Sequence, residues 1–182
     1  MQEVASITPT VTIGIDLGDR LSQYCVLDEG GSVVDEGRLT TSPAAFGVRF
    51  GGAARARIAL EVGTHSPWVC ELLKAAGHEV LVANARRLRM IFDSASKNDR
   101  FDARQFARVA RLNPSLLYAI EHRGRAARVD LALVRARACL VTERTRLVNH
   151  MRGALKSFGV RANKCSTPGF HERAARIGTP SG

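Results

Sequence analysis

The feature that most constrains how this chain can fold is a long stretch without proline. From residue 123 to residue 158 there is no proline, and Gly124 and Gly153 are the only glycines. Mostly apolar residues recur there at spacings of three and four, which predicts a helix with one apolar side. They are Leu131, Val134, Ala138, Val141, Thr145, Val148 and Met151. At ~1.5 Å per residue such a helix is about 50 Å long. The rest of a 182-residue chain cannot cover it, so we expect it to project and to pair with a partner.

The first half of the chain has the pattern of a mixed α/β domain. Short runs rich in β-branched residues predict strands, and Asp28-Glu29-Gly30-Gly31 is a hairpin turn signal between two of them. The expected strands cover residues 11–16, 23–28, 32–39, 57–62 and 79–83. The expected helices cover residues 43–50, 65–76 and 99–112, and residues 86–92 can form another. Hairpin strands followed by alternating helices and strands indicate a mixed sheet with flanking helices.

We therefore expect three segments. They are an α/β domain over residues 9–112, a helical coiled-coil region over 113–160 and a linker or tail over 161–182. No apolar run approaches the ~18 residues that a membrane helix needs, so we expect no membrane association. The first residues have neither the basic nor the apolar segment of a secretory signal. The expected location is the cytoplasm of a bacterium or archaeon.

The positive charge of the chain is concentrated in one region. The sequence has 27 basic and 17 acidic residues, a formal net charge of +10. Residues 86–152 hold 16 of the basic and 6 of the acidic residues, and the remainder is neutral. Arginine accounts for 23 of the basic residues, and its planar guanidinium can bind two phosphate oxygens at once. This local excess of positive charge predicts a polyanionic partner.

The cysteines and histidines give no comparable signal. The four cysteines lie far apart without zinc-ligand spacing, so we expect them to be reduced and mostly buried. The five histidines form no pair at a spacing of three or four and are expected to be structural or surface residues. His65 is nevertheless close enough in sequence to Glu61 to line the same site.

Four acidic residues are candidates for a metal site, and each has an ordinary structural explanation as well. Asp16 ends the first expected strand, where α/β sheets hold ligands, but aspartate is also common in turns. Glu61 ends another expected strand, where it either binds a cation or reaches solvent. Asp99 and Asp102 are three residues apart, which places both on one face of the expected helix. Acids at such a position also cap helices.

As a set, these acids point to phosphodiester chemistry. Oxygen-only ligands suit Mg²⁺ or Mn²⁺ rather than zinc, and two such ions can activate a nucleophile and stabilise a leaving group. Gly14 and Gly18, on either side of Asp16, allow backbone and ligand to come close. Arg100 and Arg104 are four residues apart on a different helix face from the aspartates, where they could contact phosphate.

The segments around these acids carry a family resemblance. They read IGIDLG around Asp16, ALEVGTHSPWV around Glu61 and KNDRFDARQFARVAR around the two aspartates of the helix. Together with AAGHEVLVANARR and the basic segment LVRARACLVTERTRLVNHMRGALKSFG, they resemble the DEDD-motif transposases of bacterial insertion sequences. That family includes the pilin-gene invertases and the bridge-RNA-guided recombinases. The resemblance runs from about Val11 to Cys165, and the block with two aspartates is its most specific part.

The resemblance implies an RNase H-like (RuvC-like) domain followed by a helical coiled-coil region. It implies that four acids are catalytic and bind Mg²⁺ or Mn²⁺: Asp16, Glu61, Asp99 and Asp102. Three basic residues of the same block are then expected to contact nucleic acid: Lys97, Arg100 and Arg104. It further implies strand exchange in DNA, directed by a structured guide (bridge) RNA, in a homo-oligomer assembled through the long helices.

Length separates this chain from the family it resembles. The family has a second, C-terminal domain with a serine nucleophile, and this sequence stops before such a domain, so we expect an N-terminal fragment or truncated product. We assign that role to none of Ser157, Ser166 and Ser181. The main alternative is a non-catalytic module that binds nucleic acid or mediates oligomerisation. A third reading, half of an actin-like ATP-binding kinase, fits the hairpin after IGIDLG but neither the short chain nor its charge.

Overall fold

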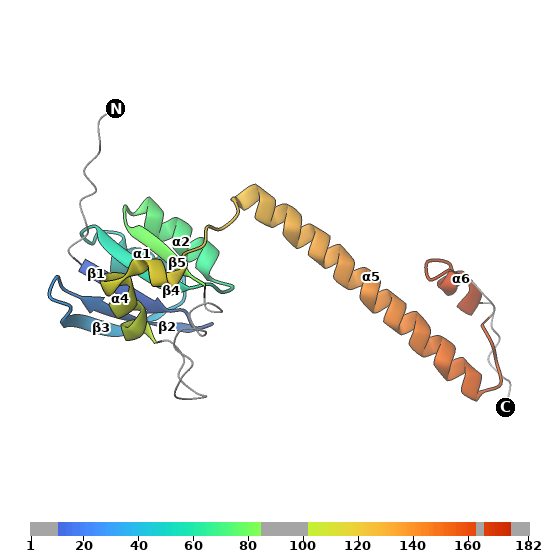
Figure 1. Ribbon diagram of the computed structural model, residues 1–182. Coiled ribbons are helices and arrows are strands. Elements are labelled where there is room, and N and C mark those ends of the chain that lie inside the picture. The colour runs from blue at the N-terminus through green and yellow to red at the C-terminus, as the bar shows by residue number, and fades with distance from the viewer. Residues whose placement is uncertain (1–10, 85–101, 163–165, 176–182) are drawn as a thin grey trace. The chain divides into compact units, whose positions relative to one another are not determined.

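The fold was analysed in a computed structural model, which describes residues 11–84, 102–162 and 166–175. The chain divides into two compact units, residues 1–122 and residues 123–182. The first unit contains a five-stranded sheet and the second a long helix, and each is described by itself (Figure 1). None of the described helices is both long and apolar enough to cross a bilayer.

The sheet of the first unit is mixed, as the sequence predicts. Its strands are β1 (Val11–Asp16), β2 (Leu21–Leu27), β3 (Val33–Thr40), β4 (Ala56–Glu61) and β5 (Glu79–Ala83). Their order across the sheet is β3-β2-β1-β4-β5. The first three strands form an antiparallel meander, whereas β1, β4 and β5 run parallel. β1 and β4 are therefore adjacent parallel strands at the centre of the sheet.

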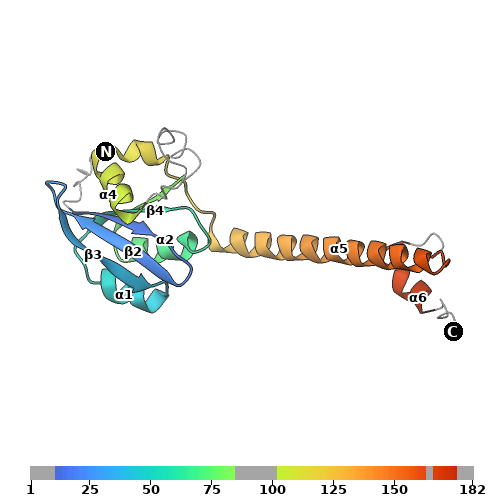
Figure 2. The same ribbon diagram turned by 90° about the horizontal axis from the view of Figure 1, so that it is seen from below.

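Helices cover both faces of the sheet. α1 (Pro43–Phe50) and α2 (Ser66–Ala75) bury one face around Phe46, Phe50 and Val69, together with Ile15 and Leu60 of the sheet. α4 (Ala103–Leu112) covers the other face, where Phe106 and Ala110 pack with Ala59 and Ala83. Figure 2 shows α1 and α4 on opposite sides of the strands. Burial on both faces explains why the middle residues of β1 and β4 are apolar.

Most of the expected elements are confirmed. The helix over residues 43–50 and the strands over 11–16 and 79–83 have the predicted bounds, and the other strands shift by one or two residues. Ser42 caps α1, accepting the Ala45 N–H at 3.3 Å, and Pro43 occupies the first turn, where its missing N–H costs nothing. Gly77, with a φ of 91°, follows α2 as the expected stop.

The structure differs most from the elements expected from the sequence at the two ends of α4. This helix was expected over residues 99–112, but it begins at Ala103, and residues 85–101, with the helix expected over 86–92, lie outside the described residues. After Asn113 the chain forms a 3₁₀ turn, η1 (Pro114–Leu117), whose Leu117 is buried beneath α4. Ile120 then forms a bridge with Val82 of β5. η1 and Ile120 thus belong to the first compact unit, which runs to residue 122.

The second unit consists of α5 (Arg125–Ser157) and the short α6 (Phe170–Ala174). The long proline-free helix is thus present, and α6 adds a helical turn to a segment expected to be a linker or tail. α5 ends where Gly159 adopts a φ of 72°, a conformation suited to glycine. Of the residues in α5, only Val148 is buried, and Arg152 places its guanidinium 5.4 Å from the ring centre of the buried Phe170.

Candidate functional site

Asp16 and Glu61 lie at the carboxyl ends of the two central parallel strands. Ile15 pairs with Leu60 in the register of β1 and β4, and Asp16 and Glu61 are the next residues on the two strands. Both are partly buried. Side chains alternate between the faces of a sheet, and Ala59, two residues before Glu61, packs beneath α4. Asp16 and Glu61 therefore lie side by side on the face that α4 covers.

Asp102 reaches the same edge from α4. The backbone of this helix passes directly over Gly14 of β1, since a Cβ atom there would lie 1.9 Å from the Ala103 carbonyl oxygen. At the other end of α4, Arg111 lies beside Gly31 in the turn between β2 and β3. Because β1 and β2 are antiparallel, this turn is at the opposite end of β1 from Asp16. α4 thus runs antiparallel to β1, with its N-terminus, and hence Asp102, at the carboxyl end of the strand.

We call Asp16, Glu61 and Asp102 the acid edge. They come from three segments far apart in the sequence, and Gly14 permits the close approach of α4 that places Asp102 at the same edge of the sheet. The expected role of Gly14 in close backbone approach is confirmed. Gly18 also makes such an approach, because a Cβ atom there would lie 2.2 Å from the Leu21 carbonyl oxygen. The fourth predicted acid, Asp99, lies outside the described residues.

Asp102 is the N-cap of α4 and not a residue of the helix itself. Its φ and ψ are −83° and 171°, and its Oδ1 accepts the Gln105 N–H at 2.8 Å. The shared helical face of Asp99 and Asp102 stays a prediction, because Asp99 lies outside the described residues, but the expectation that Asp102 lies within the helix is wrong, since α4 starts only after Asp102. The alternative explanation, helix capping, is confirmed for this residue. A carboxylate has two oxygens with about four acceptor positions, so a cap bond at Oδ1 is compatible with a cation at Oδ2.

The acid edge has the donor chemistry of a Mg²⁺ or Mn²⁺ site, although it does not form a complete site by itself. Its three side chains offer only carboxylate oxygens, the ligands these ions prefer. Within the described residues, no three side chains of the types His, Cys, Asp and Glu approach closely enough to hold a metal ion. The three carboxylates thus provide the type of ligand that these ions prefer at one edge of the sheet, but they do not form a complete site by themselves.

Arg104, predicted to contact nucleic acid, makes an ion pair within the first unit. Its Nη2 lies 2.7 Å from Oε2 of Glu36 on β3. The hydrogen bond from Arg104 to Glu36 raises the pKa of the guanidinium, so it stays charged at any physiological pH. Lys97 and Arg100, the other two predicted contacts, lie outside the described residues.

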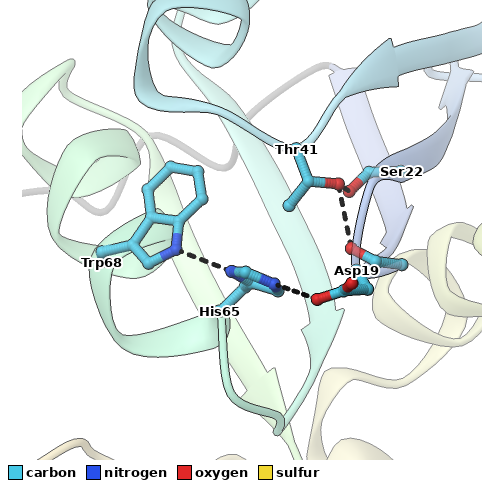
Figure 3. A network of polar contacts seen from close by, with 6 residues as sticks. Asp19, Ser22, Thr41, His65 and Trp68 are labelled. Atoms are coloured by element: carbon cyan, nitrogen blue, oxygen red, sulfur yellow. Dashed lines mark hydrogen bonds and ion pairs between the residues drawn. The ribbon is translucent and has the colours of Figure 1, made fainter.

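Two further polar residues stand on the loops that follow the acid edge (Figure 3). The Trp68 indole N–H lies 3.1 Å from Nδ1 of His65, and Nε2 of His65 lies 3.4 Å from Oδ1 of Asp19. Asp19 follows Asp16 by three residues, and His65 follows Glu61 by four. The sequence analysis placed His65 near Glu61 but did not single out Asp19. The one sequence feature that could have indicated Asp19 is its position in the turn after β1.

The net charge of the protein belongs to the second unit. Residues 123–182 contain 13 basic and 3 acidic residues, a net charge of +10, whereas residues 1–122 contain 14 of each. On α5 the basic residues are spread along the whole helix, with seven arginines and Lys156 against Asp130 and Glu143. The acid edge and the basic surface are thus features of different units.

The fold and the acid edge define an α/β protein with a carboxylate-lined end to its central parallel strands. A family model described as a transposase matches residues 13–159, which is most of the chain and spans both units. The chain therefore belongs to the family of DEDD transposases of IS110-type insertion sequences. The family resemblance noted in the sequence is confirmed. A comparison with curated proteins gives no significant match.

Solved structures give only partial likenesses. One is an inorganic polyphosphate/ATP-glucomannokinase from Arthrobacter sp. strain KM, with 18% identity, a TM-score of 0.30 and coverage of 44% of this chain and 46% of the kinase. Another is a ROK family glucokinase from Streptomyces griseus, with 20% identity, a TM-score of 0.30 and coverage of 49% of this chain and 39% of the kinase. This chain spans less than half the length of either kinase, and likenesses of this size carry no argument about activity.

Proposed function

We propose that residues 11–122 form the RNase H-like (RuvC-like) part of an insertion-sequence transposase, which binds Mg²⁺ or Mn²⁺ and acts on DNA. The observation that carries this proposal is the acid edge in a chain that belongs to a transposase family. The antiparallel meander joined to parallel β4 and β5 is compatible with such a fold. Asp16, Glu61 and Asp102, together with Asp99, would hold the metal.

Each part of the acid edge has a distinct task in this proposal. When bound, divalent cations would activate a nucleophile and stabilise the leaving oxygen at a phosphodiester. Ile15 and Leu60 are the last residues paired in the register of β1 and β4, so Asp16 and Glu61 stand at the ends of two strands that the sheet holds side by side. Asp102 is oriented by its cap bond to Gln105, and the N-terminus of α4 favours its negative charge. The scaffold thus supplies prepositioned carboxylates at a sheet edge that DNA can approach.

Calorimetric titration with Mn²⁺ tests the site. The full chain is compared with Asp16→Asn, which removes one carboxylate without a large change of volume, and with Glu29→Gln as a control. Glu29 is an exposed carboxylate in the turn between β2 and β3, at the opposite edge of the sheet. We expect Asp16→Asn to lower the affinity for Mn²⁺ at least about tenfold, since even changes to residues that only contact a metal ligand lower metal affinity that much. Equal affinities in all three proteins would exclude the acid edge as the metal site.

We further propose that the second unit binds nucleic acid, both the DNA substrate and a structured guide RNA. Its net charge of +10 and the arginines along α5 support this assignment. Binding through phosphate contacts loses affinity steeply with salt, in proportion to the number of phosphates neutralised. Filter binding of duplex DNA and structured RNA at several salt concentrations tests the proposal, and a salt-independent affinity would contradict it.

The same helix supports a homo-oligomer. Leu133, Leu140 and Leu147 recur at intervals of seven residues and are 66%, 71% and 63% exposed. A leucine at every seventh position is the spacing with which helices pair along a common seam. We expect Leu140→Lys to lower the mass measured by sedimentation equilibrium, whereas Cys139→Lys, at an exposed position outside both the leucine row and the apolar row of Val134 and Val141, does not. An unchanged mass in Leu140→Lys would exclude this seam.

The second candidate function is a non-catalytic module for nucleic-acid binding or assembly. The neutral first unit and the basic second unit favour it, because binding by α5 does not require the acid edge. If the chain is such a module, Asp16→Asn leaves both metal and nucleic-acid affinity unchanged. If the chain carries a metal site, the same substitution removes metal binding selectively.

A further inference from the structure

His65 has a fixed tautomer. The Trp68 indole nitrogen can only donate a hydrogen bond, so Nδ1 of His65, 3.1 Å away, is the acceptor. In the neutral ring the proton then resides on Nε2, which lies 3.4 Å from Oδ1 of Asp19 (Figure 3). The imidazole therefore accepts from a side chain packed against the core and donates to a carboxylate in the turn after β1.

The two ends of this connection lie in the segments that directly follow Asp16 and Glu61. Asp19 lies in the turn that follows Asp16, and Thr41 holds this turn through its Oγ1 bond to the Gly18 carbonyl, 2.9 Å, and its N–H bond to the Arg20 carbonyl, 3.0 Å. His65 lies in the loop that follows Glu61. That loop is held on its other side, where the Val62 N–H donates to the Ala83 carbonyl at 3.1 Å. The His65–Asp19 contact thus joins two loops that are each anchored elsewhere.

The connection contributes little to folding. The Asp19 side chain is 94% exposed, and an exposed pair of this kind adds little to stability. His65 also occupies the N-cap position of α2 without making a side-chain cap bond, although residues with a short acceptor side chain are preferred there. The imidazole at this N-cap thus links Trp68 to Asp19 instead of capping the helix, and a residue that departs from a local preference in this way is typical of a functional constraint.

We infer that His65 is a positioning residue for the metal site, because it joins the turns that directly follow Asp16 and Glu61 and so holds the ends of these two strands together. This inference rests on the proposed metal-binding function of the acid edge. His65 acts through Asp19 and through its own loop, while Trp68 holds the imidazole in the tautomer that donates to Asp19. Loss of the His65–Asp19 bond is then expected to weaken divalent-ion binding without unfolding the protein.

Two matched pairs of variants test the inference by calorimetry with Mn²⁺ on the full chain. His65→Gln can place an amide N–H near Asp19, whereas the shorter side chain of His65→Asn retains only an acceptor for Trp68. Asp19→Asn keeps an oxygen that accepts from His65, whereas Asp19→Ala does not, and both remove the charge. We expect His65→Asn to lower the affinity for Mn²⁺ about tenfold relative to wild type, and His65→Gln to stay within about threefold of wild type. Asp19→Ala should bind Mn²⁺ about tenfold more weakly than Asp19→Asn.

Thermal melting and the imidazole ¹⁵N signals of His65 provide readouts independent of metal. Melting temperatures close to wild type would confirm that the variants fold, and Trp68→Phe should lose the pure Nε2–H signature. If Asp16→Asn loses Mn²⁺ binding while His65→Asn and Asp19→Ala keep the affinity of their partners, the positioning role is refuted and the metal site stands. If Asp16→Asn binds like wild type, the metal site is refuted and the role of His65 falls with it.

Discussion

Replacing Gly14 with alanine is expected to destabilise the first unit strongly. A Cβ atom at this position would lie 1.9 Å from the Ala103 carbonyl oxygen and 2.4 Å from the Ala107 nitrogen, whereas ordinary contact begins at 3.4 Å. α4 would have to withdraw from the sheet by about 1.5 Å, the difference between the shorter distance and ordinary contact. Overpacking of a core typically costs ~1–3 kcal/mol when side chains can adjust. Here both obstacles are backbone atoms, so we expect a loss at the upper end, about 3 kcal/mol.

Urea unfolding followed by tryptophan fluorescence measures this loss. Trp68 is the only tryptophan of the chain and lies in α2 of the first unit, so its signal reports on that unit. Gly47→Ala is the matched control, because Gly47 lies within α1 and has nothing within 4 Å of its Cβ position. In a helix interior, alanine is favoured over glycine by ~1 kcal/mol, so the control should gain stability. An unfolding midpoint for Gly14→Ala equal to that of wild type would refute the close approach of α4.

Three further predictions follow from single contacts. Asp102→Asn should keep the cap of α4 and the stability of the fold but lose affinity for Mn²⁺. Asp102→Ala should lose this affinity and, in urea unfolding, ~1 kcal/mol of stability as well. Equal stabilities of Asp102→Asn and Asp102→Ala would contradict the cap. His78→Ala should cost ~1–3 kcal/mol in the same assay, because the buried Ala56 N–H that donates to Nδ1 of His78 at 3.2 Å loses its acceptor. Burial raises the pKa of the Cys25 thiol, so less thiolate is present at a given pH. Mass-spectrometric mapping of iodoacetamide labelling at pH 8 should find the exposed Cys139 modified and Cys25 unmodified until the protein unfolds, and labelling of native Cys25 would contradict this.

The strands and most helices could be predicted from the sequence because their signals are local. A run such as Ile58–Leu60 is apolar on both faces, and the structure buries it between α4 and the α1–α2 layer. Ser42-Pro43 and Gly77 mark helix ends through properties of the residues themselves. Such signals need no knowledge of the rest of the fold.

The start of α4 could not be predicted in the same way. Aspartates at positions 99 and 102 are both compatible with the first turn of a helix or with its cap. The structure settles Asp102 as the cap, because the helix axis is fixed by Phe106 and Ala110 against the sheet and by the close approach to Gly14. The His65–Asp19 contact was equally hidden, since it joins residues 46 positions apart through the geometry of two loops.

The acid edge and the basic helix belong to different units, so the proposed metal binding and the proposed nucleic-acid binding use different residues. The first unit has equal numbers of acidic and basic residues, whereas the second carries a net charge of +10. Among the described residues of the first unit, Arg104 pairs with Glu36 and Arg57 with Glu79. In the proposed function the basic second unit supplies most of the affinity for a polyanion, while three carboxylates at one sheet edge repel phosphate unless a cation neutralises them. A bound divalent ion would therefore have two effects on the first unit: it would complete the acid edge as a site, and it would lower the repulsion between that edge and a phosphodiester.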